Sequence, residues 1–239
     1  ILSASRVAVD TETTSADPMR AELVGISLAW EPHRAIYVPV GHRYLGAPEQ
    51  PSRAEVLRIL APLLESPEKV KTGQNVKYDV EVLRRAGARP AAFAFDTMIA
   101  AFLLEPDRPS FSLGVLAKEY LGDYKIPFSE VAGKGAKTVT FDQVEVGRAA
   151  VYSGRDADVT LRLATELDRR LGSESLQHVF NEIDMPLIEV LADMEMTGVR
   201  IDLDLLARLS KEMGIQIASI RAEIHQLAGE PVNPNSPKQ

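Results

Sequence analysis

The chain has 239 residues, of which 45% are hydrophobic and none is cysteine. This length allows one sizeable core and a smaller appended unit. The absence of cysteine excludes disulfides and thiolate zinc sites, and it favours a cytoplasmic location. Because proteins that coat duplex DNA are basic, a net charge of −7 argues against that class. No apolar run has the length of a membrane-spanning helix. The opening residues Ile1-Leu2-Ser3 lack the features of a signal peptide, so we interpret them as the start of a domain.

Three strand patterns open the chain, at residues 6–12, 23–30 and 35–40, and the turn Glu31-Pro32-His33-Arg34 predicts that the last two form an antiparallel hairpin. Ser52 then begins a capping-box pattern before a helix that ends at Glu65. The next predicted elements, in chain order, are a short strand at 69–72, helices at 76–87, 97–104 and 113–121, a connector rich in Lys and Gly at 124–140, and a helix with or without a break at 142–171.

Strands that precede interleaved helices predict an α/β fold with a mixed central sheet flanked by helices. A change in composition at residues 172–175 predicts a domain boundary that divides the chain into residues 1–173 and residues 174–239. Long helical patterns follow at 179–196 and 203–227, with a turn and a short strand at 198–202 between them. The last pattern has apolar residues at coiled-coil-like spacing: Leu206, Leu209, Met213, Ile217, Ile220, Ile224 and Leu227.

Two carboxylates lie on the first predicted strand. Side chains alternate along a strand, so Asp10 and Glu12 share the face of Ala8, with α-carbons roughly 7 Å apart. Like charges so close repel each other unless a cation lies between them. A solvated edge strand explains the pair equally well when the pattern is taken alone.

A second pattern places Asn75 and Asp79 four residues apart, on one face of a helix near its start. This pattern is also explained without chemistry. Asn75 fits an N-cap, and Asp79 fits the positive end of the helix dipole.

A third pattern places Asp156 on an otherwise apolar helical stripe with Tyr152, Val159 and Leu163. Burying a carboxylate there is costly unless something compensates its charge, and a metal ion is sufficient. Asp158, one step round the helix, is predicted to face solvent. The histidines have no metal-ligand spacing to one another and are interpreted as structural or surface residues: His33, His42, His178 and His225.

Taken in order, the three patterns resemble the motifs of the DEDD exonuclease superfamily, which has an RNase H-like fold. Within it, the chain is most similar to the bacterial DNA polymerase I family. Tyr152 lies four residues before Asp156, and Val151 stands where another subclass has histidine, which indicates the tyrosine subclass. The resemblance is carried by Asp10-Thr11-Glu12-Thr13, Gly73-Gln74-Asn75-Val76-Lys77-Tyr78-Asp79, Ala94-Phe95-Asp96-Thr97-Met98, Ala132-Gly133-Lys134-Gly135 and Asp156-Ala157-Asp158-Val159-Thr160-Leu161.

Residues 195–202 resemble the segment that leads into the polymerase thumb of this family, and residues 235–239 resemble the start of the next thumb helix. The second unit is therefore expected to be a small, mainly helical, partial thumb. Such a unit should leave apolar surface around Leu206, Met213 and Ile220 that is mobile, packed on a neighbouring chain, or covered by a segment outside this sequence.

The resemblance implies a metal-dependent 3′→5′ exonuclease that proofreads DNA in replication and repair. Its substrates would be single-stranded 3′ ends and frayed primer termini, and its product nucleoside monophosphates. The implied partner is the remainder of the parent polymerase, and the implied location is the cytoplasm, at the nucleoid and not at a membrane. Because no polymerase carboxylate motif is present, DNA synthesis by this chain is not expected.

The resemblance also implies two divalent ions, Mg²⁺ or Mn²⁺, with Zn²⁺ as an alternative at the tighter site. Asp10, Glu12 and Asp156 would ligate the tighter ion, and Asp10 and Asp79 the second. Tyr152 would orient the attacking water, because a phenol is too weakly acidic to be the obvious base. The implied substrate contacts are Thr13, Gln74, Asn75, Tyr78 and Phe141, although an aromatic at the last position also fits a core role.

Two other functions remain open at this point. An RNase D-like exoribonuclease has the same carboxylates and tyrosine, and only the region after Gly172 favours a polymerase relative. A catalytically silent scaffold would have lost the carboxylates. The presence of a residue for every required role favours an active enzyme.

Overall fold

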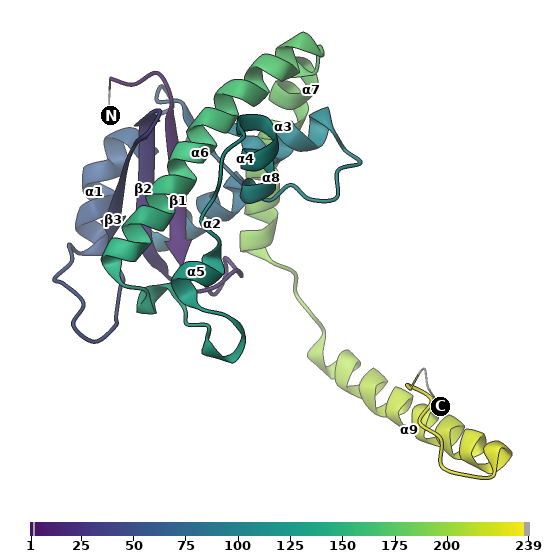
Figure 1. Ribbon diagram of the computed structural model, residues 1–239. Helices are drawn as coiled ribbons and strands as arrows, with labels where there is room; N and C mark the ends of the chain where they lie inside the picture. The colour runs from purple at the N-terminus through teal and green to yellow at the C-terminus, as the bar shows by residue number, and fades with distance from the viewer. Residues whose placement is uncertain (2, 237–239) are drawn as a thin grey trace. The chain divides into compact units, whose positions relative to one another are not determined.

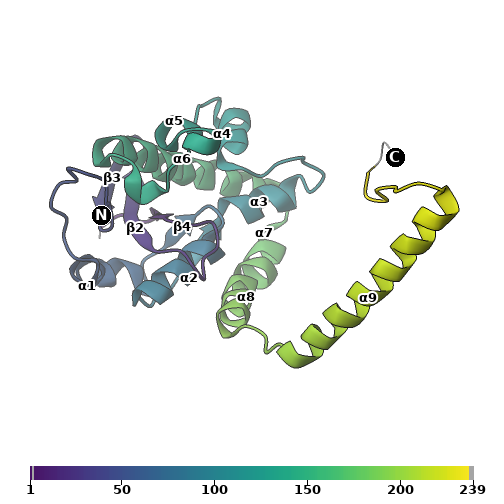
Figure 2. The ribbon, with the colours of Figure 1, turned by 90° about the horizontal axis from the view of Figure 1, so that it is seen from below.

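The computed structural model describes residue 1 and residues 3–236, and it divides into two compact units, Ile1–Thr197 and the part from Gly198 onward. In the first unit, helices cover both faces of a five-stranded sheet (Figures 1 and 2). Most of the predicted thumb-helix start at 235–239 lies outside the described residues. Among the described residues, no helix combines the length and the apolar character needed to cross a bilayer.

The central sheet is mixed, as predicted. Its strand order is β3-β2-β1-β4-β5, with β1 antiparallel to β2 and parallel to β4. The last strand was not predicted, because a four-residue segment is too short to show an alternating pattern. The strands are β1 (Val7–Thr13), β2 (Leu23–Glu31), β3 (Arg34–Pro39), β4 (Lys71–Gly73) and β5 (Phe93–Asp96).

The helices of the first unit follow the predicted positions, and those predicted at 97–104 and 113–121 have the predicted bounds. The predicted connector contains a short helix, and the predicted helix at 142–171 is broken because Glu145 caps a new helix there, accepting the N–H groups of Gly147 and Arg148 at 2.8 Å. The α-helices are α1 (Arg53–Leu64), α2 (Val76–Ala86), α3 (Thr97–Leu104), α4 (Leu113–Leu121), α5 (Phe128–Ala132), α6 (Val146–Ser173), α7 (Gln177–Val179) and α8 (Met185–Thr197). The described residues also form short 3₁₀ helices, η1 (Gly135–Lys137) and η2 (Phe141–Gln143), and a π-helix, η3 (Phe180–Asp184).

Strand β1 lies at the centre of the sheet and packs on both faces. Val7 and Val9 belong to a core cluster with residues of α1 and α2. Ala8 packs instead with Ala157 of α6, the long helix that crosses the other face of the sheet (Figure 2). The alternation predicted from the sequence is therefore confirmed, and the face that carries Asp10 and Glu12 is directed toward α6.

Helix α8 packs on α2 through ion pairs. Lys77 pairs with Glu195, and Arg84 pairs with Glu189 and, at 2.8 Å, with Asp193. By packing, the first unit thus extends to Thr197. The domain boundary predicted at residue 173 from the change in composition stays a prediction.

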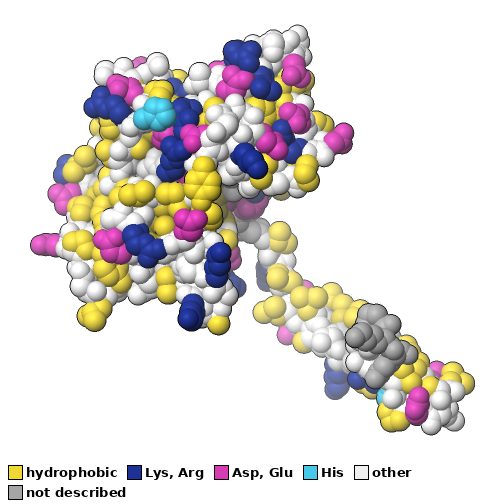
Figure 3. Space-filling model, in the orientation of Figure 1, with side chains coloured by type: hydrophobic (Ala, Val, Ile, Leu, Met, Phe, Trp, Pro, Cys, Tyr) yellow, Lys and Arg dark blue, Asp and Glu magenta, His cyan; other side chains and the backbone are white. Residues whose placement is uncertain are grey.

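The second unit consists of α9 (Leu203–Ala228) and the segments beside it. The backbone at 198–201 pairs with no strand in the described structure, so the predicted short strand is wrong; Asp202 caps the helix by accepting the N–H of Leu205 at 2.9 Å. None of the residues of α9, all of which the structure describes, is buried. Leu206, Met213 and Ile220 are 48%, 56% and 55% exposed, and Figure 3 shows apolar side chains along this helix.

Asp96 offers a test of the packing that positions α2. Its Oδ2 accepts the N–H of Val76 at 2.7 Å, and its Oδ1 accepts those of Asn75 and Met98 at 3.2 and 2.8 Å. Asp96→Asn turns one acceptor into a donor that faces an N–H group, so we expect the free energy of unfolding to fall by roughly 2 kcal/mol. Urea denaturation measures this change. Asp107→Asn, at an exposed position, is the control, and equal stability of the two variants would contradict the role of Asp96.

Candidate carboxylate site

Two carboxylates of β1 meet α6 across the sheet face. Asp10 lies opposite Ser27 of β2, whose hydroxyl donates to Asp10 Oδ2 at 3.3 Å. Glu12 accepts a hydrogen bond from Ser153 of α6 at 2.6 Å. Asp156, one turn further along the same helix, is buried at 5% exposure. The buried stripe predicted for α6 is confirmed, and it brings Asp156 to the strand pair.

Asp79 reaches the same site from the first turn of α2. Strand β4 pairs with β1 only at Val7 and Ala8, so the N–H of Thr11 is left beyond the end of that pairing. This N–H and the Thr11 hydroxyl both donate to Asp79 Oδ1, at 2.9 and 2.6 Å. The carboxylate is thereby held at 3% exposure beside β1.

The four carboxylates act on one another electrostatically. Burial, followed by the charge of Asp156, raises the pKa of Asp10 to about 7. Burial, followed by the charge of Asp10, raises the pKa values of Glu12 and Asp79 well above their usual range. Burial also raises the pKa of Asp156. Carboxyl groups with pKa values raised by burial and by one another are typical of a functional site.

Lys125 was not predicted as part of this site. Its Nζ forms an ion pair with Asp156 and lies 3.0 Å from Tyr152 Oη and 4.5 Å from the centroid of the Tyr152 ring. The lysine belongs to the loop between α4 and α5, where the sequence shows no motif. Only the tertiary structure brings it to α6.

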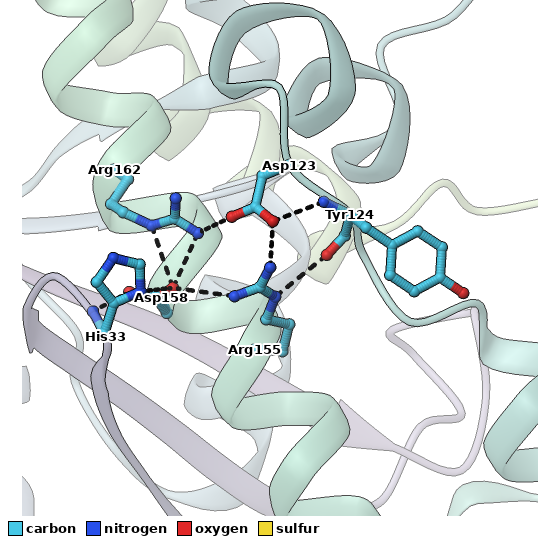
Figure 4. Close-up of polar contacts among 6 residues, drawn as sticks. All are labelled: His33, Asp123, Tyr124, Arg155, Asp158 and Arg162. Carbon is cyan, nitrogen blue, oxygen red and sulfur yellow. Dashed lines mark hydrogen bonds and ion pairs between the residues drawn. The ribbon is translucent and has the colours of Figure 1, made fainter.

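Asp158 was predicted to face solvent, and this prediction is wrong, because the residue is buried at 4% exposure. Its carboxylate accepts the backbone N–H of His33 at 2.5 Å and pairs with Arg162 at 3.0 Å and with Arg155 at 3.8 Å. The same two arginines hold Asp123, in the loop after α4 (Figure 4). Asp158 therefore belongs to an ion-pair network on α6, which compensates the cost of burying its charge.

The donor set of the carboxylate site fits a hard divalent cation. Its ligating atoms are carboxylate oxygens, and in the described part of the chain Asp156 Oδ1 is buried without a hydrogen-bond partner. Among residue 1 and residues 3–236, no three His, Asp or Glu side chains already meet as a metal-ligand cluster. Ser153, Thr11 and Lys125 each donate a hydrogen bond to one of the carboxylates.

Three of the predicted substrate contacts lie at the end of β1 and the start of α2. Tyr78 Oη is hydrogen-bonded to the Thr13 hydroxyl and donates to the Ser15 carbonyl at 2.5 Å. Asn75 is exposed and has a left-handed backbone with φ of 61°. Gln74, by contrast, uses its amide within the protein, because its Nε2 donates to Phe111 O at 2.9 Å and its Oε1 accepts from Thr97.

Phe141 was given as a substrate contact, and this prediction is also wrong, because at 2% exposure its ring cannot stack on a nucleic-acid base. It packs in a core cluster with Val144 and Tyr152. Phe128 of α5 covers it with a stacked ring and meets Tyr152 edge-on, with a centroid distance of 6.3 Å in both pairs. Phe128 is 43% exposed and presents an aromatic ring at the surface beside Tyr152. The sequence did not single out this residue.

The raised pKa of Asp10 predicts a pH-dependent cost of folding in the presence of a metal chelator. Between its ordinary pKa of 3.8 and its folded-state pKa of about 7, the folded chain retains a proton that the unfolded chain has lost, so stability falls as pH rises through this range. Asp10→Asn removes the ionisable group and should stabilise the protein at pH 8 by on the order of 2 kcal/mol, with a smaller gain at pH 5. Urea denaturation at the two pH values checks this, with Asp107→Asn as the control. A gain that is equal or larger at pH 5 would contradict the assignment.

Comparison with known proteins identifies the family. A 3′–5′ exonuclease family model matches residues 1–172. The chain is 44% identical over 239 residues to DNA polymerase I of Pseudomonas aeruginosa and 41% identical over 250 residues to that of Rhizobium leguminosarum. These alignments cover 99% and 98% of this chain but 26% and 24% of the relatives, so the chain spans about a quarter of their length.

Solved structures confirm the predicted RNase H-like α/β fold. The POL domain of Pol1 from M. smegmatis, in complex with DNA primer-template and dNTP, has a TM-score of 0.77 at 24% identity, covering 99% of this chain and 36% of that one. Brucella melitensis NrnC has a TM-score of 0.61 at 18% identity, covering 82% and 87%. Together with the family match over residues 1–172, these findings show that the chain belongs to the 3′–5′ exonuclease family of DNA polymerase I.

Proposed function

We propose that the first unit is an active, metal-dependent exonuclease that hydrolyses the terminal phosphodiester of single-stranded or frayed DNA 3′ ends and releases nucleoside monophosphates. The supporting observation is the convergence of carboxylates from β1, α2 and α6 beside Tyr152. Within a parent polymerase, this reaction is proofreading. We also propose the division into an exonuclease domain at 1–173 and a partial thumb at 174–239, and a cytoplasmic location at the nucleoid.

The carboxylates would hold two divalent ions, Mg²⁺ or Mn²⁺. Asp10, Glu12 and Asp156 are assigned to the tighter ion, where Zn²⁺ is an alternative, and Asp10 and Asp79 to the second. When bound, such ions activate a water molecule and stabilise the leaving oxygen of an in-line displacement. Hydrogen bonds fix the carboxylates that would hold these ions, since Ser27 donates to Asp10, Ser153 to Glu12, and Thr11 to Asp79.

Tyr152 acts as a hydrogen-bonding group and not as a base. Burial, followed by the charge of Asp156, raises the pKa of its phenol above the usual value, so the hydroxyl stays protonated. A protonated phenol can orient the attacking water but cannot remove its proton. The ring is held between Phe128, Phe141 and the ammonium of Lys125, which restricts its rotamer.

The substrate strand is proposed to approach over Phe128 and the exposed Asn75. An exposed aromatic ring binds unpaired bases of any sequence by stacking, as a 3′ exonuclease requires. Thr13 and Tyr78 would contact the terminal nucleotide from the end of β1. An RNase D-like exoribonuclease is the second candidate, because the geometry of the carboxylates does not distinguish DNA from RNA.

Digestion of a 5′-labelled single-stranded DNA oligonucleotide with Mg²⁺ tests this function. We expect a ladder that shortens from the 3′ end, loss of roughly 10³-fold in rate for Asp10→Ala and Asp156→Ala, and loss of roughly 10²-fold for Tyr152→Phe. Asp107→Ala and a chelator are the controls. Faster digestion of the matching RNA would favour the exoribonuclease, and no digestion of either, despite bound Mg²⁺, would favour a silent scaffold.

Phe128→Ala tests the approach of the strand. Loss of one stacked base predicts a KM for single-stranded DNA raised by about tenfold, with little change in kcat. Phe102→Ala, at an exposed phenylalanine of α3, is the control. An unchanged KM for Phe128→Ala would show that the strand takes another path.

A further inference from the structure

The loop between α4 and α5 places the positive charge of Lys125 among the acidic groups. The acidic groups themselves come from β1, α2 and α6. Its ammonium pairs with Asp156 Oδ2, and its side chain is 18% exposed. Burial raises the pKa values of Asp10 and Glu12, and the charge of Lys125 offsets part of that rise, so it acts on carboxylates of both β1 and α6. The ammonium is therefore part of the electrostatic balance of the site.

The residues before Lys125 tie it to α6. Asp123 accepts hydrogen bonds from Arg155 and, at 2.5 Å, from Arg162, and Arg155 Nε donates to the carbonyl oxygen of Tyr124 at 3.1 Å. Figure 4 shows both arginines directed from α6 toward this loop. The helix that carries Asp156 and Tyr152 thus also positions the backbone that delivers the lysine.

The lysine side chain runs beside α4 toward α6. A Cβ atom placed on Gly114 of α4 would lie 3.7 and 3.8 Å from Lys125 Cβ and Cδ, and the side chain is 18% exposed. A surface ion pair contributes little, because two flexible side chains must be ordered to form it. Here the backbone before the lysine is already held, and the side chains of Lys125 and Asp156 are only 18% and 7% exposed, which separates this contact from an incidental surface pair.

We propose that Lys125 is an internal counter-ion that competes with a divalent cation for Asp156, and that cation binding displaces the ammonium from this carboxylate. The proposal rests on the function proposed above. A divalent cation on the carboxylate of Asp156, whose Oδ1 is without a hydrogen-bond partner while Oδ2 holds Lys125, would lie close to the ammonium, and like charges at that separation repel. Lys125 is accordingly a positioning residue that orients Asp156 and sets the cation concentration at which the site fills.

Isothermal titration calorimetry of the full chain with Mn²⁺ alone measures this competition without any turnover. We expect Lys125→Gln to bind Mn²⁺ about tenfold more tightly than the wild type, because no ion pair has to be broken. Lys125→Arg keeps the charge and should bind like the wild type or more weakly. Lys118→Gln removes an exposed lysine of α4 and should leave the affinity unchanged.

The direction of the change distinguishes this role from loss of structure, since a poorly folded variant binds Mn²⁺ more weakly. Suppose that the wild type binds Mn²⁺, that Asp156→Asn does not, and that Lys125→Gln binds Mn²⁺ no more tightly than the wild type. This result would overturn the competition and leave the proposed exonuclease intact. Wild-type binding that is absent, or unaffected by Asp156→Asn, would instead overturn the metal site itself and this inference with it.

Chemical labelling supplies a second readout of the displacement. Acylation of lysines, followed by mass spectrometry, should label Lys125 several-fold faster when saturating Mn²⁺ has released the ammonium. Lys71, which donates to the carbonyls of Leu63 and Ser66 at 3.0 Å, and the exposed Lys118 serve as slow and fast references. A labelling rate at Lys125 that does not rise with Mn²⁺ would contradict displacement.

Discussion

The gathering of four carboxylates at one site, with Asp79 and Asp156 buried and Asp10 and Glu12 half-buried, is the constraint that orders this structure. Burial opposes the charge on each group, and Asp10 is repelled by Asp156 while Glu12 and Asp79 are repelled by Asp10. A fold that relied only on apolar packing would separate such groups. Here they are kept together because the central strand, a helix start and a long helix are each anchored by large cores elsewhere.

Helix α6 carries most of this organisation. One stripe of the helix is buried against β1, β2 and β3 and bears Tyr152 and Asp156, while Arg155 and Arg162 hold the loop that delivers Lys125. Asp158 forms ion pairs with both arginines on the inner side of the helix. Tyr152 and Asp156 lie on this helix, and its arginines also hold the loop of Lys125, so one element sets where all three side chains begin.

The acidic character of the chain is compatible with a nucleic-acid substrate. A net charge of −7 gives no long-range attraction for phosphate. Locally, however, divalent cations bound to the carboxylates would reverse the sign of the field at the place where a phosphodiester must lie. The exposed Phe128 adds an attraction that does not depend on charge.

Local patterns in the sequence determined most strands and helices of the first unit, and they singled out the acidic residues proposed for the site. Alternation on β1 and the buried stripe on α6 are short-range properties of the backbone, and both could be read from residue spacing. The family resemblance then joined patterns that were ambiguous one by one, such as Asp10 with Glu12 and Asn75 with Asp79.

Tertiary structure alone decided the features that depend on long-range proximity. Strand β5 exists because β4 offers it an edge, and Phe141 is buried because Phe128 covers it. Asp158 lies inside because Arg155 and Arg162 compensate its charge, although its place on the helix suggested solvent. Lys125 joins the site across 31 residues of sequence, by a loop whose anchors are themselves distant. Charge compensation acts through space between groups far apart in the chain, so spacing along the sequence carries no record of it.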